Sequence, residues 1–353
     1  MISLAVFIKI ISFFPEIVEN YYTYGIYPVI SKIQRLLFGW SPFSLCDLLY
    51  AFIVLFFLAK IFQLIKVVFQ KRISKPVVKA IARQLLFYAL LVYVFFNSLW
   101  GLNYSRLGIS SQLGLQVQKY NTNDLDTLTG ILQTRLNKYA SEYDSVRRRS
   151  LYFKRTLFRK STDAYKLASK QFPFLKYSHP SLKPSMYTYM GQFFGFTGYY
   201  NPFTGEGQVR TNVPVFIQPF ITTHEIAHQL GYGKENEANF VAFLVCRSYD
   251  DIDFRYSLYF DLYSYAVTEL FNYDYQDYQL TKKYSKTLDT QVKKDRRELW
   301  RFYSKSRNMI EPLVLRVYDQ YLRMNNQPKG RHTYNEVLAW LIAYYKKYGK
   351  DSI

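Results

Sequence analysis

The sequence has few cysteines, few histidines and few acidic residues for its 353-residue length. Its two cysteines, Cys46 and Cys246, stand far apart, so neither a disulfide framework nor a paired-cysteine zinc site is expected, and the compartment is left open. Internal repeats and low-complexity tracts are also missing, which argues against a repeat architecture. Histidine occurs only four times, yet two of the four share one pentapeptide.

Acidic residues are outnumbered, because 26 Asp and Glu face 46 Lys and Arg and the formal net charge is +20. A strong positive charge attracts either the phosphates of nucleic acid or an anionic lipid surface. The basic residues are dispersed and no nucleic-acid fold signature occurs, so nucleic acid is not the expected partner. A lipid bilayer is the expected partner, and the sequence gives no indication of the oligomeric state.

Two long apolar runs lie in the first hundred residues, and polar, tyrosine-rich sequence follows from about residue 105. Residues 45–69 and 85–102 are each long and apolar enough to predict a transmembrane helix. The alternative, a pair of buried helices in a soluble protein, is less favoured because helices that are apolar on all sides belong in lipid. Residues 1–14 are apolar but short, and a first span is favoured there over a signal-like anchor or an interfacial segment.

The sequence between the two runs predicts the orientation of the anchor. It is rich in basic residues and has no acidic residue, and short loops of this kind remain in the cytoplasm. The basic residues are Lys66, Lys71, Arg72, Lys75, Lys79 and Arg83. We therefore expect residues 1–105 to form a membrane anchor of two or three helices, and residues 106–353 to fold outside the cytoplasm.

The part after the anchor is predicted to be mainly helical. Residues 119–172 have leucines near helical spacing in a polar background. Glycines and prolines between His179 and Pro219 interrupt this pattern, which is typical of loops and a small sheet. Helical periodicity resumes at about Pro219 and continues to the end of the chain. The predicted fold class is mainly α, with transmembrane helices followed by an α+β domain whose small sheet lies next to one key helix.

The pentapeptide His224-Glu225-Ile226-Ala227-His228 predicts that this helix carries a zinc site. Residues four apart share one face of a helix, so both imidazoles can bind one Zn2+ while Glu225 reaches a water molecule as general base. Thr222 or Thr223 is expected to cap the start of the helix, and the glycine turn at 231–233 to end it. A histidine pair on an ordinary packed or solvated helix is the alternative.

A catalytic zinc takes a third protein ligand and keeps one position open for water. Glu235 or Glu237, just after the glycine turn, can supply that ligand. They cannot share the role, because residues two apart on a helix point about 200° apart. The carboxylate that does not bind metal would be a helix N-terminal charge, stabilised by the macrodipole.

The motif and the residues after it resemble the zincin metallopeptidases whose third ligand is glutamate, the gluzincins. Those enzymes often have Asp or Asn four residues after that glutamate, where it holds a ligand histidine, and Ala at three and seven. Glu235 with Asn239 fits this spacing, whereas Glu237 is followed at four by Val241. The resemblance therefore favours Glu235 as ligand and Asn239 as its supporting residue. Glu237 remains the alternative, because its Glu-Ala-Asn setting also resembles some zincins.

The same resemblance suggests two further groups of residues. Zincins generally have an edge strand ahead of the active helix that pairs with an extended peptide. Here that strand would comprise Gln208, Val209, Arg210, Thr211, Asn212 and Val213, with a surface hairpin that binds no ligand as the alternative. Zincins also often use a Tyr or His from a downstream helix to stabilise the oxyanion. His332 and Tyr334 are the candidates, and a packed or solvated aromatic is the alternative for each.

The chain as a whole resembles a bacterial family of membrane-anchored, zincin-like proteins, a domain of unknown function grouped with the metallopeptidases that share the His-Glu-x-x-His motif. The resemblance extends over nearly the whole chain. It rests on Phe14-Pro15-Glu16, Tyr21-Tyr22, Tyr27-Pro28, Pro42-Phe43-Ser44, Trp100-Gly101-Leu102-Asn103-Tyr104, Tyr200-Asn201-Pro202-Phe203-Thr204-Gly205-Glu206 and the stretch from His224 to Phe240. It implies a multi-pass protein of the bacterial inner membrane whose C-terminal domain is periplasmic or extracytoplasmic, and it implies no substrate.

Three functions are compatible with these features. The favoured one is a zinc-dependent peptidase that hydrolyses a peptide or protein substrate in the cell envelope, with Glu225 as general base. The first alternative is a non-catalytic envelope protein in which zinc has a structural or sensor role, although such a site needs no general base. The second is a basic module that binds nucleic acid or lipid. Intramembrane cleavage is not expected, because the motif lies about 120 residues beyond the last span.

Overall fold

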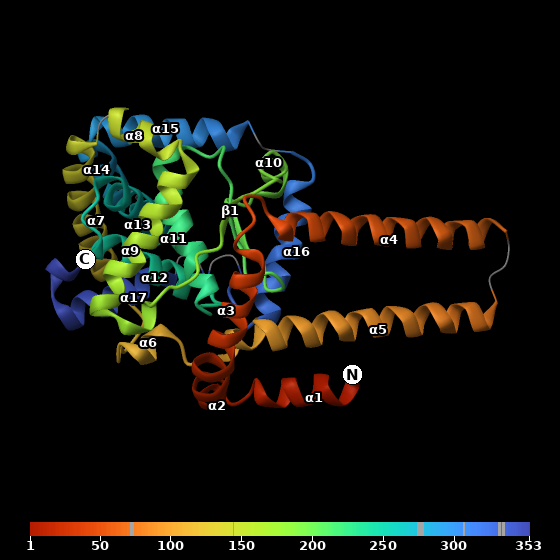
Figure 1. Cartoon of the computed structure of the whole chain (residues 1–353). Coiled ribbons are helices and arrows are strands. Elements are labelled where there is room, and N and C mark those ends of the chain that lie inside the picture. The colour runs from red at the N-terminus through yellow and green to blue at the C-terminus, as the bar shows by residue number, and fades with distance from the viewer. Residues whose placement is uncertain (71–73, 144, 274–278, 306–307, 331–332, 334–335) are drawn as a thin grey trace.

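The computed structural model describes residues 1–70, 74–143, 145–273, 279–305, 308–330, 333 and 336–353. Helices predominate in this part of the chain, and its sheet has three short strands (Figure 1). The mainly helical fold class and the small sheet are therefore confirmed. The N-terminal elements are α1 (Ile2–Ile11), α2 (Pro15–Ile17), the π-helix η1 (Val18–Ile26), α3 (Tyr27–Phe38), α4 (Leu45–Phe69), α5 (Lys75–Leu99) and the 3-10 helix η2 (Gly101–Ser105).

Helices α4 and α5 project from the rest of the molecule as an antiparallel hairpin (Figure 1). Each has 25 residues, which is roughly 37 Å of helix, and an 18-residue stretch of each has a mean hydropathy of 2.4 in α4 and 1.7 in α5. Large apolar side chains on α4, such as Phe52 and Phe62, are more than half exposed at 67% and 69%. The helices of a soluble core bury such side chains, so the alternative of two core helices is wrong. Both helices are long and apolar enough to cross a membrane.

The segment 1–14 forms a shorter helix than a span requires. Helix α1 has 10 residues, or roughly 15 Å, whereas the hydrocarbon core is about 30 Å thick. It lies along α5 and exposes Ile2 and Phe7, which are 62% and 58% exposed. The chain then turns into α2. Helix α1 is therefore about half the length of a full span, and the first span favoured for residues 1–14 stays a prediction.

The domain beyond the hairpin is built around the packing of α7 on α13. Helix α7 starts with a capping box in which the Asn121 side chain accepts from the Asp124 N–H and the Asp124 side chain accepts from the Asn121 N–H. The leucines predicted at helical spacing, Leu125, Leu128, Leu132 and Leu136, are all fully buried.

The helices of this part are α6 (Ile109–Gln112), α7 (Thr122–Glu142), α8 (Ser145–Leu151), α9 (Lys154–Gln171), η3 (Pro173–Leu175), α10 (Gly191–Phe194), η4 (Val215–Ile217), α11 (Gln218–Gln229), α12 (Glu235–Ser248), α13 (Ile252–Tyr273), α14 (Gln279–Thr287), α15 (Thr290–Ser304), α16 (Glu311–Met324), α17 (Val337–Tyr348) and η6 (Lys350–Ser352).

The sheet consists of β1 (Leu182–Pro184), β2 (Gly198–Tyr200) and β3 (Gly207–Val209), in the order β1-β3-β2. Strand β3 is central, parallel to β1 and antiparallel to β2, and it packs against α11. Of the substrate strand predicted at 208–213, only Gln208 and Val209 belong to β3, which is the central strand and not an edge strand; a role of these residues in substrate binding stays a prediction. A turn between Asn201 and Glu206 folds β3 back onto β2, and β1 occupies its other side. Strand β2 is an edge strand, and its side facing away from β3 pairs with no other strand in the described part of the chain.

Candidate metal centre

Helix α11 carries both histidines of the motif and is buried along its whole length. It begins at Gln218, with Pro219 in its first turn, where the missing N–H of proline costs nothing. Thr222 and Thr223 therefore lie inside the helix, and their hydroxyls donate to the carbonyls of Gln218 at 2.7 Å and Pro219 at 3.1 Å. The predicted threonine cap is wrong, because the helix starts one turn earlier than the motif indicates.

The glycine turn after α11 ends the helix and also holds one of its histidines. Gly231 has φ +86°, and its N–H donates to the His228 carbonyl while the Tyr232 N–H donates to the Ala227 carbonyl. This pair of bonds is a Schellman motif, which needs a left-handed residue at this position. The turn directs the carbonyl of Tyr232 back toward the helix, where it lies 2.7 Å from Nδ1 of His228.

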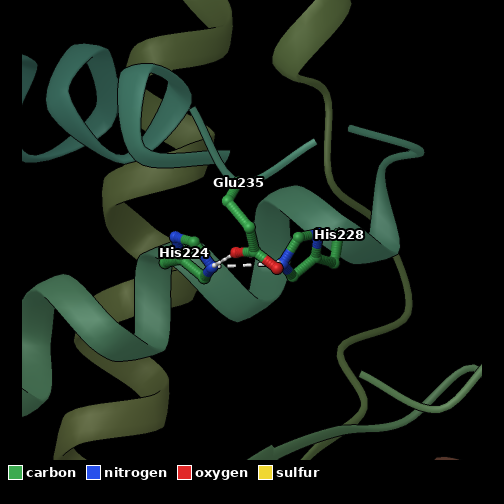
Figure 2. Close-up of side chains that lie close together, drawn as sticks. All are labelled: His224, His228 and Glu235. Atoms are coloured by element: carbon green, nitrogen blue, oxygen red, sulfur yellow. Dashed lines mark hydrogen bonds and ion pairs between the residues drawn. The ribbon is translucent and has the colours of Figure 1, made fainter. Parts of the chain in front are cut away.

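The structure brings His224, His228 and Glu235 together, as Figure 2 shows. The two Nε2 atoms are 3.1 Å apart, and Oε2 of Glu235 lies 3.1 Å from that of His224 and 3.6 Å from that of His228. A tetrahedral zinc with bonds of about 2.0–2.1 Å separates its ligand atoms by roughly 3.3 Å. The spacing of the three atoms therefore fits one zinc ion.

The hydrogen bonds on the far side of each imidazole decide which atoms face one another. Nδ1 of His224 lies 2.8 Å from Oδ1 of Asn239, and Nδ1 of His228 faces the Tyr232 carbonyl. Both partners are acceptors, so in the neutral rings the Nδ1 atoms carry the protons and the Nε2 atoms present lone pairs. Two lone pairs and a carboxylate oxygen thus converge, and this donor set is suited to a cation.

Burial and the neighbouring charges shift the pKa values of this cluster. Burial lowers the pKa of His224, but the Glu235 carboxylate outweighs burial at His228 and raises the pKa of His228 to about 9. Burial would raise the pKa of Glu235, yet the two imidazoles hold it well below its usual range. At neutral pH the cluster therefore attracts positive charge, either a proton or a metal ion.

Glu237 lies on the other side of α12, away from the histidines. Its carboxylate packs against Gly108 and is 3.7 Å from Nζ of Lys234. Arg106 also acts on it electrostatically, although burial raises the pKa of Glu237 overall. Of the two carboxylates that the sequence offers as third ligand, only Glu235 contacts the histidines in the part of the chain that the structure describes.

Glu225 is buried beside the cluster, and burial raises its pKa to about 8. Its Oε2 atom has no hydrogen-bond partner among the described residues. Gly198 of β2 packs directly against the carboxylate, which leaves no room there for a Cβ atom. An unpaired buried carboxylate costs free energy unless it is protonated or meets a ligand, so Glu225 is suited to exchanging a proton with a molecule bound beside it.

Three supporting residues were not predicted from the sequence. The Tyr318 hydroxyl on α16 donates to Oε1 of Glu235 at 3.0 Å. Nε1 of Trp100 donates to the His228 carbonyl at 2.9 Å, and the Tyr27 hydroxyl donates to the Gln229 carbonyl at 2.7 Å. The last two bonds reach carbonyls in the last turn of α11, where a helix lacks N–H partners of its own, and the His228 carbonyl also accepts from the Gly231 N–H. No local pattern distinguishes Tyr318 among 35 tyrosines.

The remaining predicted residues are not part of the cluster. His332 and Tyr334 lie outside the described residues, so their role in stabilising an oxyanion stays a prediction. Gln208 is buried against Ser44, and Arg210 donates to the side chain of Asn212 at 2.7 Å. None of the residues 208–213 lines the cavity next to Glu225.

Comparison with known proteins identifies a family for the chain. No curated protein and no solved structure matches the chain. Residues 22–342 match a family described as a protein of unknown function, DUF3810, and this range includes the cluster of His224, His228 and Glu235 and the hairpin. The match covers far more than half of the 353 residues. The chain therefore belongs to the DUF3810 family.

Proposed function

We propose that this protein is a membrane-anchored zinc peptidase. The observation that carries the proposal is the convergence of two imidazole nitrogens and one carboxylate oxygen within 3.1–3.6 Å, beside the buried carboxylate of Glu225. Among the described residues, three side chains of metal-binding type come together here, not four. A structural zinc site normally has four protein ligands, so three ligands and an adjacent base favour a catalytic site.

His224, His228 and Glu235 would hold the zinc, and Asn239 and Tyr318 would keep two of these ligands in place. Bound zinc supplies a Lewis acid that polarises a peptide carbonyl and lowers the pKa of water. Glu225 accepts a proton from the attacking water and then donates it to the nitrogen of the leaving amine. A pKa raised by burial to about 8 makes Glu225 able to perform both transfers near neutral pH.

The free edge of β2 offers a place for the substrate backbone. The Thr197 carbonyl accepts from the Arg210 N–H, and the Asn201 N–H donates to the Glu206 carbonyl, so these groups face β3. Backbone groups alternate along an antiparallel strand, and those of Gly198 and Tyr200 therefore point away from β3. An extended peptide that paired with this edge would pass next to Glu225, because Gly198 contacts its carboxylate.

We also propose that the hairpin anchors the protein in a bacterial inner membrane and that the domain lies outside the cytoplasm. Lys66, Lys75, Lys79 and Arg83 lie toward the end of the hairpin that is far from the domain. Basic residues at one end of a pair of spans favour the cytoplasmic side for that end. The metal cluster, at the opposite end, would then face the periplasm or the exterior, and its substrate would be a polypeptide of the cell envelope.

The test compares cells that contain the wild-type protein with cells that contain Glu225→Gln. New N-terminal peptides of envelope proteins are identified by mass spectrometry, and the zinc content of both purified proteins is measured. We expect some cleavage products to disappear in the variant while zinc binding is retained. If zinc is retained and the peptide profiles are identical, the protein is not a peptidase and a structural or sensor role is favoured.

A further inference from the structure

The cavity beside Glu225 is walled by both apolar helices of the hairpin as well as by the domain. Its volume is about 970 Å³. The wall that includes the cluster contains His224, Glu225 and His228, and the wall from the hairpin contains Tyr50 of α4 with Val92 and Phe96 of α5. The site is therefore not confined to the water-facing domain, because part of its wall is membrane helix.

The cavity also follows the hairpin for some distance away from the domain. Val92 is seven residues before the end of α5, which corresponds to roughly 10 Å along the helix, and Tyr50 is five residues after the start of α4, or roughly 8 Å. Helix α16 forms the neighbouring wall with Val314 and Leu315, and its Leu313 and Val317 are 62% and 64% exposed. An apolar rim of this kind at the base of a membrane hairpin is suited to contact with lipid.

Direct hydrogen bonds fix the hairpin to the site. Trp100, at the end of α5, donates to the carbonyl of the ligand residue His228. At the start of α4, the Glu206 carboxylate accepts from the backbone N–H groups of Leu45 and Cys46 at 3.3 and 2.7 Å. The Asp47 carboxylate accepts from the N–H of Met186 and the hydroxyl of Tyr199 on β2, at 2.7 and 2.6 Å.

These contacts determine how far the cluster lies from the membrane. The cluster is about one side chain away from the end of α5, because Trp100 directly follows that helix and reaches His228. The separation of about 120 residues along the sequence is therefore no guide to distance in space. The prediction against intramembrane cleavage relied on this separation, which does not describe how close the cluster lies to the hairpin.

We infer that the substrate is a polypeptide anchored in the bilayer close to its scissile bond, and that it reaches Glu225 from the membrane surface along α5 and α16. The inference rests on the proposed peptidase function. A polypeptide fits better than a lipid, because the free edge of β2 presents backbone groups that pair with peptide amides. An extended chain covers about 3.3 Å per residue, so the scissile bond would lie within roughly ten residues of the anchor.

The position of the cleavage sites tests this inference. The sites that depend on Glu225 are mapped in the envelope proteome of wild-type and Glu225→Gln cells, and their distance from the nearest membrane span or lipidated residue is counted. We expect these sites to lie within about ten residues of an anchor, on the outer side. Sites in soluble proteins or in distant loops overturn the inference but leave the peptidase proposal intact. If no site depends on Glu225, both fail, and if only lyso-lipids change, the substrate is a lipid.

A pair of tryptophan variants tests the route to the site. Val92→Trp fills the part of the cavity that lies along α5, whereas Leu86→Trp introduces the same side chain at a position of α5 that is 55% exposed and outside the cavity. A peptide containing a mapped cleavage site is offered to the protein in nanodiscs, once with a lipid tether and once without. Val92→Trp should lower the tethered-to-untethered ratio of kcat/KM at least tenfold, and Leu86→Trp should leave it unchanged. An equal ratio in all three proteins would contradict entry from the membrane.

Discussion

Asn239 is the residue that orients His224 toward Glu235. Its Oδ1 atom lies 2.8 Å from Nδ1 of His224, and the side chain is almost completely buried. Residues that hold a metal ligand in this way typically contribute 10- to 100-fold to metal affinity. We expect Asn239→Ala to weaken zinc binding by about that factor, as measured by competition with a chromophoric chelator.

Asn236 provides the matched control for this substitution. It is also a buried asparagine on α12, but its side chain donates to Glu336 and not to a histidine. Asn236→Ala should change zinc affinity little, even if it lowers stability to a similar extent. Equal losses of zinc affinity in the two variants would show that Asn239 acts through general stability alone.

Asp261, a residue of α13, should make the stability of the protein depend on pH. Burial raises its pKa to about 8, whereas an aspartate in an unfolded chain has a pKa of about 3.9. Between these values the folded protein holds a proton that the unfolded chain has lost, so the free energy of unfolding falls as pH rises from 4 to 8. Tyr265 and Tyr303 interact with Asp261 but remain protonated in this range, because burial raises the pKa of both.

Asp261→Asn removes this titration, since an amide does not ionise. The melting temperature of the variant should exceed that of the wild type by more at pH 8 than at pH 5. A difference of 1 kcal/mol corresponds to roughly 2–4 °C in a domain of this size. Thermal melts of both proteins in the same detergent at the two pH values provide the measurement. If the difference in melting temperature between the variant and the wild type is the same at both pH values, Asp261 is ionised in the folded state.

At the residue scale, the sequence contained enough information for the cluster and for Asn239, but not for three other supporting residues. The spacing of Glu235 to Asn239 along one helix is a local signal, and the structure brings both residues to the histidines. Tyr27, Trp100 and Tyr318 come from distant parts of the chain, and a single sequence gives no signal that they converge. The oxyanion candidates His332 and Tyr334 remain predictions.

The end of helix α11 is the element on which the site depends most. Gly231 adopts φ +86°, and a Cβ atom there would lie 2.9 Å from a ring carbon of Tyr27 and 3.0 Å from Oδ1 of Asn103. An alanine therefore has both an unfavourable backbone and a steric clash. Gly231→Ala should lower stability by about 2–4 kcal/mol and weaken zinc binding, because the turn holds the Tyr232 carbonyl against His228.

Gly114→Ala separates the cost of the backbone conformation from the cost of the steric clash. Gly114 also has positive φ, +56°, but a Cβ atom there would meet only the flexible end of Lys347. This variant should lose about 1 kcal/mol of stability and keep its zinc affinity. Chemical denaturation and zinc titration of both variants are the measurements. If Gly114→Ala is as destabilised as Gly231→Ala, the clash with Tyr27 is not the cause of the lower stability of Gly231→Ala.

At the element scale, periodicity predicted the helices and misplaced the strand. The leucine pattern of α7 is long enough for an average over several turns, and it agrees with the buried face. The strands have only three residues each, and which of them is the edge depends on pairing between β1 and β3, which no local pattern records. The cap predicted at the threonines of α11 was wrong for a local reason. Ser and Thr prefer caps, but they also occur inside helices, where their hydroxyls donate to earlier carbonyls.

At the scale of the whole molecule, residues before 105 contact the helix that carries the histidines. The hydroxyls of Tyr27 and Ser31 and the indole of Trp100 donate to carbonyls at the end of α11. A fragment of residues 106–353 lacks all three donors and exposes the surface that they cover. The Gln229 carbonyl loses the Tyr27 and Ser31 hydroxyls, and a buried carbonyl without a partner costs about 1–3 kcal/mol. We therefore expect the fragment to bind no stoichiometric zinc, as measured by mass spectrometry of the purified protein.

A chain with a shortened hairpin is the control for this fragment. The rings of Phe56 and Tyr88 are 6.0 Å apart, so a short Gly-Ser linker can replace residues 57–86 and join α4 to α5 nearer the domain. All the contacts to α11 are kept, and this chain should bind zinc like the full one. If the fragment 106–353 binds zinc equally well, the N-terminal residues are only an anchor.

At the scale of the whole chain, composition predicted the two helices of the hairpin but not their place beside the site. The second run, predicted at 85–102, is wrong in its bounds, because α5 begins at Lys75 and ends at Leu99. Two apolar runs are enough to predict two helices that are long enough to cross a membrane. The contacts of Trp100 with His228 and of Asp47 with Tyr199 join positions more than 100 residues apart. Long-range pairs of this kind are a property of the folded chain, so sequence distance gave the wrong picture of where the cluster lies.

The most direct test of the central claim is the zinc content of the purified full-length protein and of two glutamate variants. The wild type and Glu237→Gln should each hold one zinc per chain after dialysis against a weak chelator, whereas Glu235→Gln should lose it, because only Glu235 contacts both histidines. Light scattering checks that all three proteins remain monodisperse. A wild-type protein that takes up no zinc, or a Glu235→Gln variant that keeps it as firmly as the wild type, would contradict the account.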